Sequence, residues 1–447
     1  MHFAIYTQST AAKSGKGKYL DFTIPILVEN IQYSTSDIFA ILFIELSAMY
    51  YHREIGTRIL QLSKQYPALI LTGARQTGKT TLLKRLFPNC NYVSLDLPSL
   101  AEQAEHDPQE FLLNNPCPVI IDEAQYAPAL FRHLKVAIDQ NRDSAGQFIV
   151  TGSQKFSLMR EVSDSLAGRC VWLELEGLNL TEIKQGDWDQ KDPEQLAKAF
   201  FRGSLPELWR KPNMRVADYY RTYLATYLER DVRQIVNVGN LRDFERFIRV
   251  CAARNAQLLN KSDLAKDVGV SVNTIGQWLS VLEACNQIVL LEPYFANIGK
   301  RVVKSPKLYF CEIGLLCFLL GLSSSNIRNS PFIGNVWETF VFSEFRKWIK
   351  YRKPDAYIWF YRDNRGREVD FLVESEGRLN FYEVKWSATP KAKEVKNMIG
   401  VFDDIETKNG TLLIETGHCY LVSRTPHEYT LDGRVKVVNL DHFIEPS

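Results

Sequence analysis

A complete phosphate-binding loop at residues 73–80 constrains the fold more than any other feature of this chain. It follows an apolar run at 68–71 and precedes a helix-like segment at 81–86. A glycine-rich turn between a strand and a helix points backbone N–H groups and the helix dipole at a polyphosphate, which predicts an ATP site on a parallel α/β sheet. The residues expected to contact the nucleotide are Gly73, Ala74, Arg75, Gln76, Thr77, Gly78, Lys79, Thr80 and Thr81.

A second apolar run, at 118–121, ends in the carboxylates Asp122 and Glu123. Phosphoryl transfer depends on positioning and on neutralising the phosphate charge, so we expect Lys79 to contact the outer phosphates. Thr80 and Asp122 are expected to hold Mg²⁺, and Glu123 to orient and activate the attacking water. Alone, this run could be a buried strand followed by solvated acids; together with the loop it predicts an ATP hydrolase.

The region around these motifs has the βαβ pattern of a parallel sheet, with strands expected at 68–72, 92–95, 119–121 and 148–151. The last strand leads into Ser153 at the carboxyl edge of the sheet, where ligands bind in such folds. We expect Ser153 to sense the γ-phosphate; a simple strand-ending turn is the alternative.

Hydrolysis also needs a cation for the charge that develops on the transferred phosphoryl group. Arg169 is the preferred candidate for such an arginine finger, followed by Arg230 and Arg233. Each of the three could instead be a surface or salt-bridging arginine.

Length and composition favour a multidomain protein of the cytoplasm. The 447 residues suggest about three domains, and the formal net charge of +2 means that nucleic-acid contacts must come from local basic patches. Eight cysteines without a Cys-x-x-Cys pair favour a reducing cytoplasm over disulfides or structural zinc. The apolar run at 38–44 is shorter than the roughly 20 residues that span a bilayer, so we expect no membrane segment; membrane attachment through 38–48 is the least favoured alternative.

The middle of the chain has the pattern of a helix-turn-helix. Residues 261–279 predict two helices separated by a glycine turn, and 288–294 predict a strand that completes a winged-helix unit. Such a unit can bind DNA through its second helix. That helix exposes Asn273, Thr274 and Gln277 but no arginine, so a module that packs on the ATPase as a lid or interface is the alternative.

Near the C-terminus, two strand-like runs at 368–373 and 379–386 are joined by a turn at Glu376-Gly377. If the hairpin is symmetric about that turn, Asp370 lies opposite Glu383, and Lys385 shares the same face. Two carboxylates and an ammonium on one face suit a Mg²⁺ site. The acids would bind the ion, and the lysine would position or activate the water that attacks a phosphodiester. A solvated strand face is the alternative.

An apolar helix at 336–345 carries two glutamates that need partners in such surroundings. Glu338 is our first choice as a further ligand of the metal site, and Glu344 the second.

Taken in order, these segments resemble the prokaryotic AAA-type ATPases that carry a C-terminal domain of unknown function. The ATPase part of the resemblance rests on 73–80, 120–128, 150–153, 166–169 and 227–231. The C-terminal part, which is similar to the PD-(D/E)xK nuclease fold, rests on 307–310, 314–316, 336–345, 361–363, 368–370 and 383–385. Glu312 stands where the family usually has aspartate, which leaves the role of this position open.

The resemblance implies an α/β chain in four parts. An N-terminal extension at 1–48, expected to be poorly ordered and followed by a plausible start at Met49, precedes a P-loop ATPase domain at 49–235. A winged-helix domain at 236–300 and a restriction-endonuclease-like domain at 301–447 complete the chain.

Two functions are compatible with these parts. The favoured one is a Mg²⁺-dependent ATPase whose nucleotide cycle governs a nuclease-like, nucleic-acid-processing domain; DNA is a candidate partner, and the oligomeric state is left open, with a homo-oligomer as one candidate. In the alternative, the C-terminal fold is a regulatory or interaction surface that does not cleave.

Overall fold

The computed structural model describes residues 50–153, 158, 162, 164–184, 192–227, 232, 241–294, 304–407 and 415–440. It also describes two short antiparallel strands, β1 (Leu27–Val28) and β2 (Ile31–Gln32). The rest of the extension at 1–48 and the arginines at 230 and 233 lie outside the described residues. The chain forms two compact units, residues 1–50 and residues 51–447.

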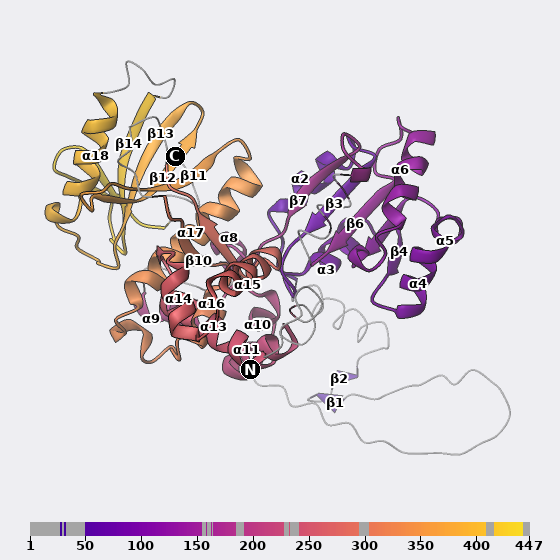
Figure 1. The fold of residues 1–447 in the computed structure, drawn as a ribbon, viewed down its shortest axis with the longest axis horizontal. Coiled ribbons are helices and arrows are strands. Elements are labelled where there is room, and N and C mark those ends of the chain that lie inside the picture. The colour runs from indigo at the N-terminus through magenta and orange to yellow at the C-terminus, as the bar shows by residue number, and fades with distance from the viewer. Residues whose placement is uncertain are drawn as a thin grey trace. The chain divides into compact units, whose positions relative to one another are not determined.

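The second unit begins with a five-stranded parallel sheet in the order β4-β5-β6-β3-β7 (Figure 1). Its strands are β3 (Ala68–Thr72), β4 (Asn91–Ser94), β5 (Val119–Asp122), β6 (Phe148–Gly152) and β7 (Cys170–Glu174). The first four confirm the predicted strands to within one residue. The edge strand β7 was not predicted, although 170–173 is a short apolar run, because such a run cannot be told from a segment of buried helix by its pattern alone.

Helices cover both faces of this sheet. They are α2 (Ile55–Leu62), α3 (Lys79–Leu86), α4 (Pro98–His106), α5 (Pro108–Asn114), the 3₁₀ turn η1 (Ala124–Tyr126) and α6 (Leu130–Gln140). The short α8 (Leu180–Ile183) follows β7, and its Leu180 packs with the helices of the middle of the chain. Leu69 and Leu71 pack with α2 and α3, whereas Ala68 and Ile70 pack with α6. Since neighbouring residues of β3 are buried on opposite faces, the strand is apolar throughout, as expected for the centre of a parallel sheet.

The middle of the chain is helical with a small antiparallel sheet. Its elements are α9 (Pro193–Arg202), α10 (Pro206–Arg210), α11 (Val216–Tyr227), α13 (Leu241–Ala253), β8 (Gln257–Leu258), α14 (Lys261–Val268), α15 (Val272–Ala284), β9 (Ile288–Leu291), β10 (Lys307–Phe310) and α16 (Ile313–Leu319). The two predicted helices are confirmed: Asn260 caps α14, Gly269 ends it at φ 84°, and Ser271 caps α15. β10 pairs with both β8 and β9, so the sheet crosses the expected domain boundary at residue 300.

The C-terminal part is a six-stranded mixed sheet in the order β11-β12-β13-β14-β16-β15. Its elements are the 3₁₀ turn η3 (Ile327–Asn329), α17 (Ile333–Arg352), β11 (Tyr357–Arg362), β12 (Glu368–Ser375), β13 (Arg378–Val384), the turn η4 (Ala392–Glu394), α18 (Lys396–Glu406), β14 (Glu415–Val422), β15 (Tyr429–Leu431) and β16 (Val435–Val438).

The predicted hairpin register is confirmed. Phe371 pairs with Tyr382 and Ser375 with Arg378, a register that continues to Asp370 opposite Glu383. The turn residues Glu376 and Gly377 both have positive φ, at 54° and 77°, as a two-residue turn between twisted strands requires. One buried apolar cluster joins the middle helices to α17 and to strands β12 and β13.

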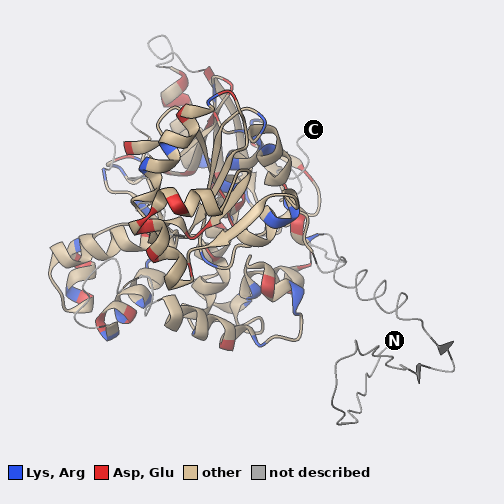
Figure 2. Cartoon of the chain, turned by 90° about the vertical axis from the view of Figure 1, so that its right-hand side faces the viewer, with Lys and Arg blue, Asp and Glu red and all other residues tan. Residues whose placement is uncertain are grey.

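Lysines and arginines are interspersed with acidic residues over the described helices in Figure 2, in keeping with the near-neutral net charge. None of the helices in the described part of the chain is long and apolar enough to cross a membrane.

Candidate functional site

The phosphate loop leaves β3 through a contact that only glycine allows. At Gly73, φ is 152°, and a Cβ atom there would lie 2.2 Å from the carbonyl oxygen of Leu175, just after β7. The amide of Leu175 in turn donates to the carbonyl of Thr72 at 2.7 Å. The loop then turns through Gln76 (φ 64°) and Gly78 (φ 91°), and α3 begins at Lys79. The predicted turn from strand to helix is therefore present.

Lys79 is buried and its ammonium lies over the loop. Nζ donates to the carbonyls of Gly73 at 3.0 Å and Ala74 at 3.1 Å. Thr80 and Thr81 follow in the first turn of α3, where backbone N–H groups have no intrahelical acceptor. The loop thus places an ammonium and free helix-end amides together, which suits a polyphosphate.

Asp122 lies at the end of β5, beside α3. Its Oδ2 accepts hydrogen bonds from the hydroxyls of Thr80 at 2.7 Å and Tyr92 at 2.9 Å. Its Oδ1 is buried and has no hydrogen-bond partner. Burial, followed by the adjacent Asp122 carboxylate, raises the pKa of Tyr92 to about 12. A threonine hydroxyl beside a carboxylate with an unpartnered oxygen is a donor set that fits Mg²⁺.

Glu123 is turned toward β6 by an unusual backbone conformation, with φ at 56°. Its Oε2 accepts hydrogen bonds from the side-chain amide of Gln125 at 2.5 Å and from the hydroxyl of Ser153 at 3.2 Å. Space there is tight, because a Cβ atom on Gly152 would lie 2.2 Å from Oε1 of Gln125. The structure therefore brings the predicted acid and the predicted sensor serine together at one edge of the sheet.

Arg169 lies at the amino-terminal ends of the strands, opposite the carboxyl ends where the phosphate loop begins. Its carbonyl accepts from the amide of Ala68, the first residue of β3, whereas the phosphate loop follows the last residue of that strand. Its guanidinium forms two hydrogen bonds to Asp139, at 2.7 and 2.9 Å. The structure thus separates Arg169 from the phosphate loop of its own chain.

Three residues near the loop were missed by sequence reasoning. Tyr92 and Gln125 lie next to recognised motifs, but nothing in their spacing marks them as partners of the acids. Arg53 is buried ahead of α2; it donates to the carbonyl of Thr77 at 2.7 Å and forms an ion pair with Glu182 at 3.1 Å. Since Glu182 belongs to the short helix α8, no local pattern could have revealed this support of the loop.

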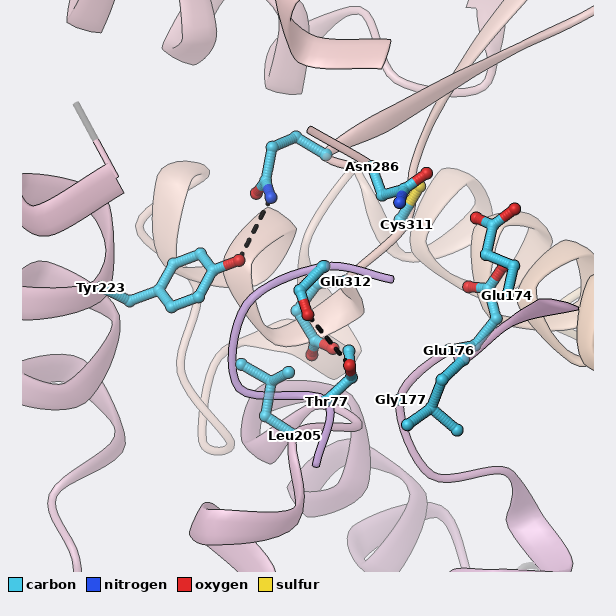
Figure 3. A pocket seen from close by; sticks show the side chains of 12 residues that line it. Thr77, Glu174, Glu176, Gly177, Leu205, Tyr223, Asn286, Cys311 and Glu312 are labelled. Carbon is cyan, nitrogen blue, oxygen red and sulfur yellow. Dashed lines mark hydrogen bonds between the residues drawn. The ribbon is translucent and has the colours of Figure 1, made fainter. Parts of the chain in front are cut away.

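A pocket of about 350 Å³, including space open to solvent, lies beside the start of the loop (Figure 3). Ala74 and Thr77 line it from the loop, and Tyr223, Asn286 and Glu312 line it from the middle of the chain. Tyr219 of α11 also donates a hydrogen bond to the loop residue Gln76.

The role left open for Glu312 is structural. Its carboxylate accepts hydrogen bonds from the amides of Ser204 and Gly314 and from the hydroxyl of Tyr220, and by accepting from Gly314 it caps α16. The longer side chain at this position is thus used to join α16 to the loop ahead of α10.

The predicted C-terminal residues also converge. Lys385 Nζ lies 2.6 Å from Glu383 Oε1 and 3.5 Å from Asp370 Oδ2, and that same oxygen accepts from the amide of Val384 at 2.8 Å. Glu338 of α17 lies at the same cluster, because Lys307 Nζ is 3.1 Å from Glu338 Oε1 and 3.9 Å from Asp370 Oδ1. Glu344 does not join them: it accepts from the amide of Leu180 and pairs with Lys347.

Three members of this cluster were missed. Lys307 Nζ lies 3.1 Å from Glu338 Oε1 and 2.5 Å from Glu368 Oε1, and the hydroxyl of Tyr309 donates to Glu338. For Glu368 the sequence predicted only a place at the start of a strand. Burial, followed by the nearby Asp370 carboxylate, raises the pKa of Glu383 to about 8.

Comparison with family models divides the chain into three. Residues 65–184 match a model described as an AAA domain, which confirms the AAA-type ATPase part of the resemblance. Residues 193–326 and 333–443 match two domains of unknown function, DUF8612 and DUF4143. The matched ranges leave 185–192 and 327–332 between them, and the domain bounds expected at 235 and 300 stay predictions.

The chain is also similar to a solved ATPase structure and to two mycobacterial proteins. The Walker-type ATPase PABY2304 of Pyrococcus abyssi is 15% identical with a TM-score of 0.43, covering 60% of this chain and 96% of that one. The uncharacterized proteins Mb2031c of Mycobacterium bovis and Rv2008c of Mycobacterium tuberculosis are each 30% identical over 381 residues, which is 83% of this chain and 82% of theirs. The chain therefore belongs to the family of these uncharacterized mycobacterial proteins, and its N-terminal part is a P-loop AAA-type ATPase domain.

Proposed function

We propose that the chain binds ATP with Mg²⁺, hydrolyses it to ADP and phosphate, and uses this cycle to govern its C-terminal domain. One observation carries the proposal: the loop lysine, the Thr80–Asp122 pair and the Ser153–Glu123 pair all lie at the carboxyl edge of one parallel sheet. Ligands bind at this edge in open α/β sheets.

Binding depends on the loop and the first turn of α3. The loop amides and Lys79 contact the phosphates, and Arg53 keeps the loop in place by holding the carbonyl of Thr77. Mg²⁺, when bound between Thr80 and Asp122, neutralises charge on the phosphates. Tyr92 fixes the orientation of the Asp122 carboxylate by donating to Oδ2, which leaves Oδ1 for the ion or its water.

Hydrolysis depends on Glu123. Its carboxylate accepts a proton from the water whose oxygen attacks the γ-phosphorus, while the bond from that phosphorus to the β–γ bridging oxygen breaks and ADP leaves. Gln125 holds the carboxylate, and Ser153 reports the γ-phosphate because its hydroxyl can exchange Glu123 for a phosphate oxygen.

The arginine finger, if Arg169 supplies it, acts on the nucleotide of another copy of the chain. Within one chain Arg169 is at the opposite edge of the sheet from the loop. This supports a homo-oligomer as the active form, with a site completed between copies.

Coupling to the C-terminal domain is assigned to α17. Arg346 of this helix pairs with Glu176 and Lys350 with Glu174, the last residue of β7. The hydroxyl of Tyr351 accepts from the amide of Glu176 at 2.9 Å. The carbonyl of Glu176 accepts from Arg53 at 2.6 Å, which also holds the phosphate loop. Since Glu338 lies on the same helix, a movement of the loop can reach the C-terminal cluster through rigid elements.

The partner that we propose for the C-terminal domain is DNA. The three helices and three antiparallel strands at 241–310 support the winged-helix assignment, and the carboxylates and lysine on paired strands support the nuclease resemblance. The geometry of Lys307 favours the second candidate, in which this domain engages its partner without cleaving it.

ATP hydrolysis by the purified chain tests the first part of the proposal. We expect Lys79→Ala to abolish binding and turnover, and Glu123→Gln to lower kcat by about 10²–10³-fold while ATP still binds. Lys64→Ala, at an exposed lysine after α2, is the matched control. Unchanged hydrolysis in Lys79→Ala would remove the basis of the proposal.

Hydrogen exchange tests the coupling. Adding a non-hydrolysable ATP analogue to the wild type should change amide exchange in α17 as well as in the phosphate loop. An analogue that protects the loop but leaves α17 unchanged contradicts the coupling and leaves the ATPase assignment standing.

A further inference from the structure

Lys307 enters the C-terminal carboxylate cluster from outside the C-terminal sheet. It is the first residue of β10, a strand of the middle sheet, and only 2% of its surface is exposed. Its Nζ lies 2.5 Å from Glu368, 3.1 Å from Glu338 and 3.9 Å from Asp370. The ammonium is thus the cation that these three carboxylates share.

A divalent ion at this cluster needs the space that the ammonium takes. Magnesium binds carboxylate oxygens at about 2.0–2.1 Å and requires several of them, or waters, around it. Glu338 Oε1 already accepts from Lys307 and from Tyr309, and Asp370 Oδ2 accepts from the amide of Val384. Among the residues that the structure describes, no group of three or more His, Cys, Asp or Glu side chains is arranged to hold a metal.

Three basic side chains already offset charge in this cluster. Lys307 faces Glu338, Glu368 and Asp370, and Arg362 pairs with Glu368 at 2.8 Å. Lys385 lies 3.5 Å from Asp370 and 2.6 Å from Oε1 of Glu383, whose Oε2 is buried and has no hydrogen-bond partner. The four carboxylates thus face three cations of the chain itself.

We propose that Lys307 closes the C-terminal carboxylate cluster as a built-in cation, so that this domain takes no divalent metal and does not cleave phosphodiesters. The cluster instead fastens β10 of the middle sheet to α17 and β12 by buried ion pairs. The predicted metal ligands Glu338, Asp370 and Glu383 are in this view members of a structural charge centre. The inference is independent of ATP hydrolysis, since it uses no residue of the phosphate loop.

The test is a Mn²⁺ titration of the nucleotide-free full chain, followed by electron paramagnetic resonance. We expect Asp370→Asn to leave the number of bound Mn²⁺ ions unchanged relative to the wild type, and Glu383→Gln to do the same. Loss of one bound ion in either variant would overturn the proposal. Wild-type protein incubated with single-stranded and duplex DNA and Mn²⁺ should give no products; cleavage abolished by Asp370→Asn contradicts it equally.

Removing the built-in cation should allow the cluster to bind a divalent metal. Lys307→Met leaves three carboxylates together, so we expect it to gain one Mn²⁺ site that Asp370→Asn then removes. Lys353→Met, at an exposed lysine paired with Glu376, is the matched control and should gain none. A folded Lys307→Met protein that gains no site contradicts the role of the lysine; if it does not fold, the wild-type titration and cleavage assay decide. ATP turnover measured on the same preparations separates failure here from failure of the ATPase proposal.

Discussion

The chain contains two carboxylate sites at strand ends, and they obtain their counter-charge differently. At the ATPase edge, Asp122 and Glu123 have hydroxyl and amide partners, and within the described residues neither forms an ion pair with a lysine or arginine. In the C-terminal cluster, Lys307 and Lys385 already pair with the acids. The first site can accept a cation, whereas the second contains its own.

Under our proposal for Lys307, a carboxylate motif alone does not indicate a metal. Both sites place acids at the ends of buried strands, and both contain one buried acid oxygen without a partner, on Asp122 and on Glu383. The two sites differ in Lys307, a basic side chain that belongs to β10 of the middle sheet and pairs with the acids of the C-terminal cluster.

Replacing the buried lysine of each site should have unequal effects on stability. Lys307→Met leaves buried carboxylates uncompensated and should lower the free energy of unfolding by about 3–5 kcal/mol. Lys79→Met removes hydrogen bonds to two loop carbonyls and should cost about 1 kcal/mol. Urea denaturation of both variants in nucleotide-free buffer measures the difference, and equal losses would break the comparison.

The stability of the C-terminal cluster should depend on pH through Glu383. Its pKa in the folded chain, about 8, lies above its ordinary value of 4.5, so folding favours the protonated form. Its contribution is complete below pH 4.5 and is lost as pH rises toward 8. Glu383→Gln removes this loss, and we expect its stability relative to the wild type to increase by about 3–4 kcal/mol between pH 5 and 8. Urea denaturation at both pH values is the measurement, and a decrease contradicts the prediction.

The Mg²⁺ requirement of ATP hydrolysis should depend on only one of the two sites. Asp122→Asn removes the carboxylate at the ATPase edge and should raise the Mg²⁺ concentration for half-maximal turnover by about 10–100-fold. Asp370→Asn, the matching change in the C-terminal cluster, should leave it unchanged. Steady-state ATPase assays over a Mg²⁺ series measure both, and a shift in Asp370→Asn would link the sites.

The smallest effect is expected at Arg169. In dilute protein, where copies do not meet, Arg169→Ala should change kcat by less than about 2-fold, because its guanidinium pairs with Asp139 away from the loop. Turnover measured across a range of protein concentrations checks this. A large loss at every concentration would mean that Arg169 acts within its own chain.

Much of the fold was predictable because its signals are local. The strand-turn-helix of the phosphate loop, the paired helices at 261–284 and the hairpin around Glu376-Gly377 each depend on residues close in sequence. The edge strand β7 was missed although 170–173 is apolar, because so short a run does not by itself distinguish strand from helix, and its partner β3 lies far away along the chain.

The amino-acid sequence by itself determined the nucleotide loop, the acids that face it and the register that sets Asp370 opposite Glu383, since spacing along the backbone controls these features. Only the tertiary structure decided that Arg53 supports the loop, that Arg169 lies at the far edge of the sheet and that Lys307 enters the acidic cluster. These features depend on which distant segments pack together. They matter energetically because a charged group removed from water is costly unless the fold places a partner beside it.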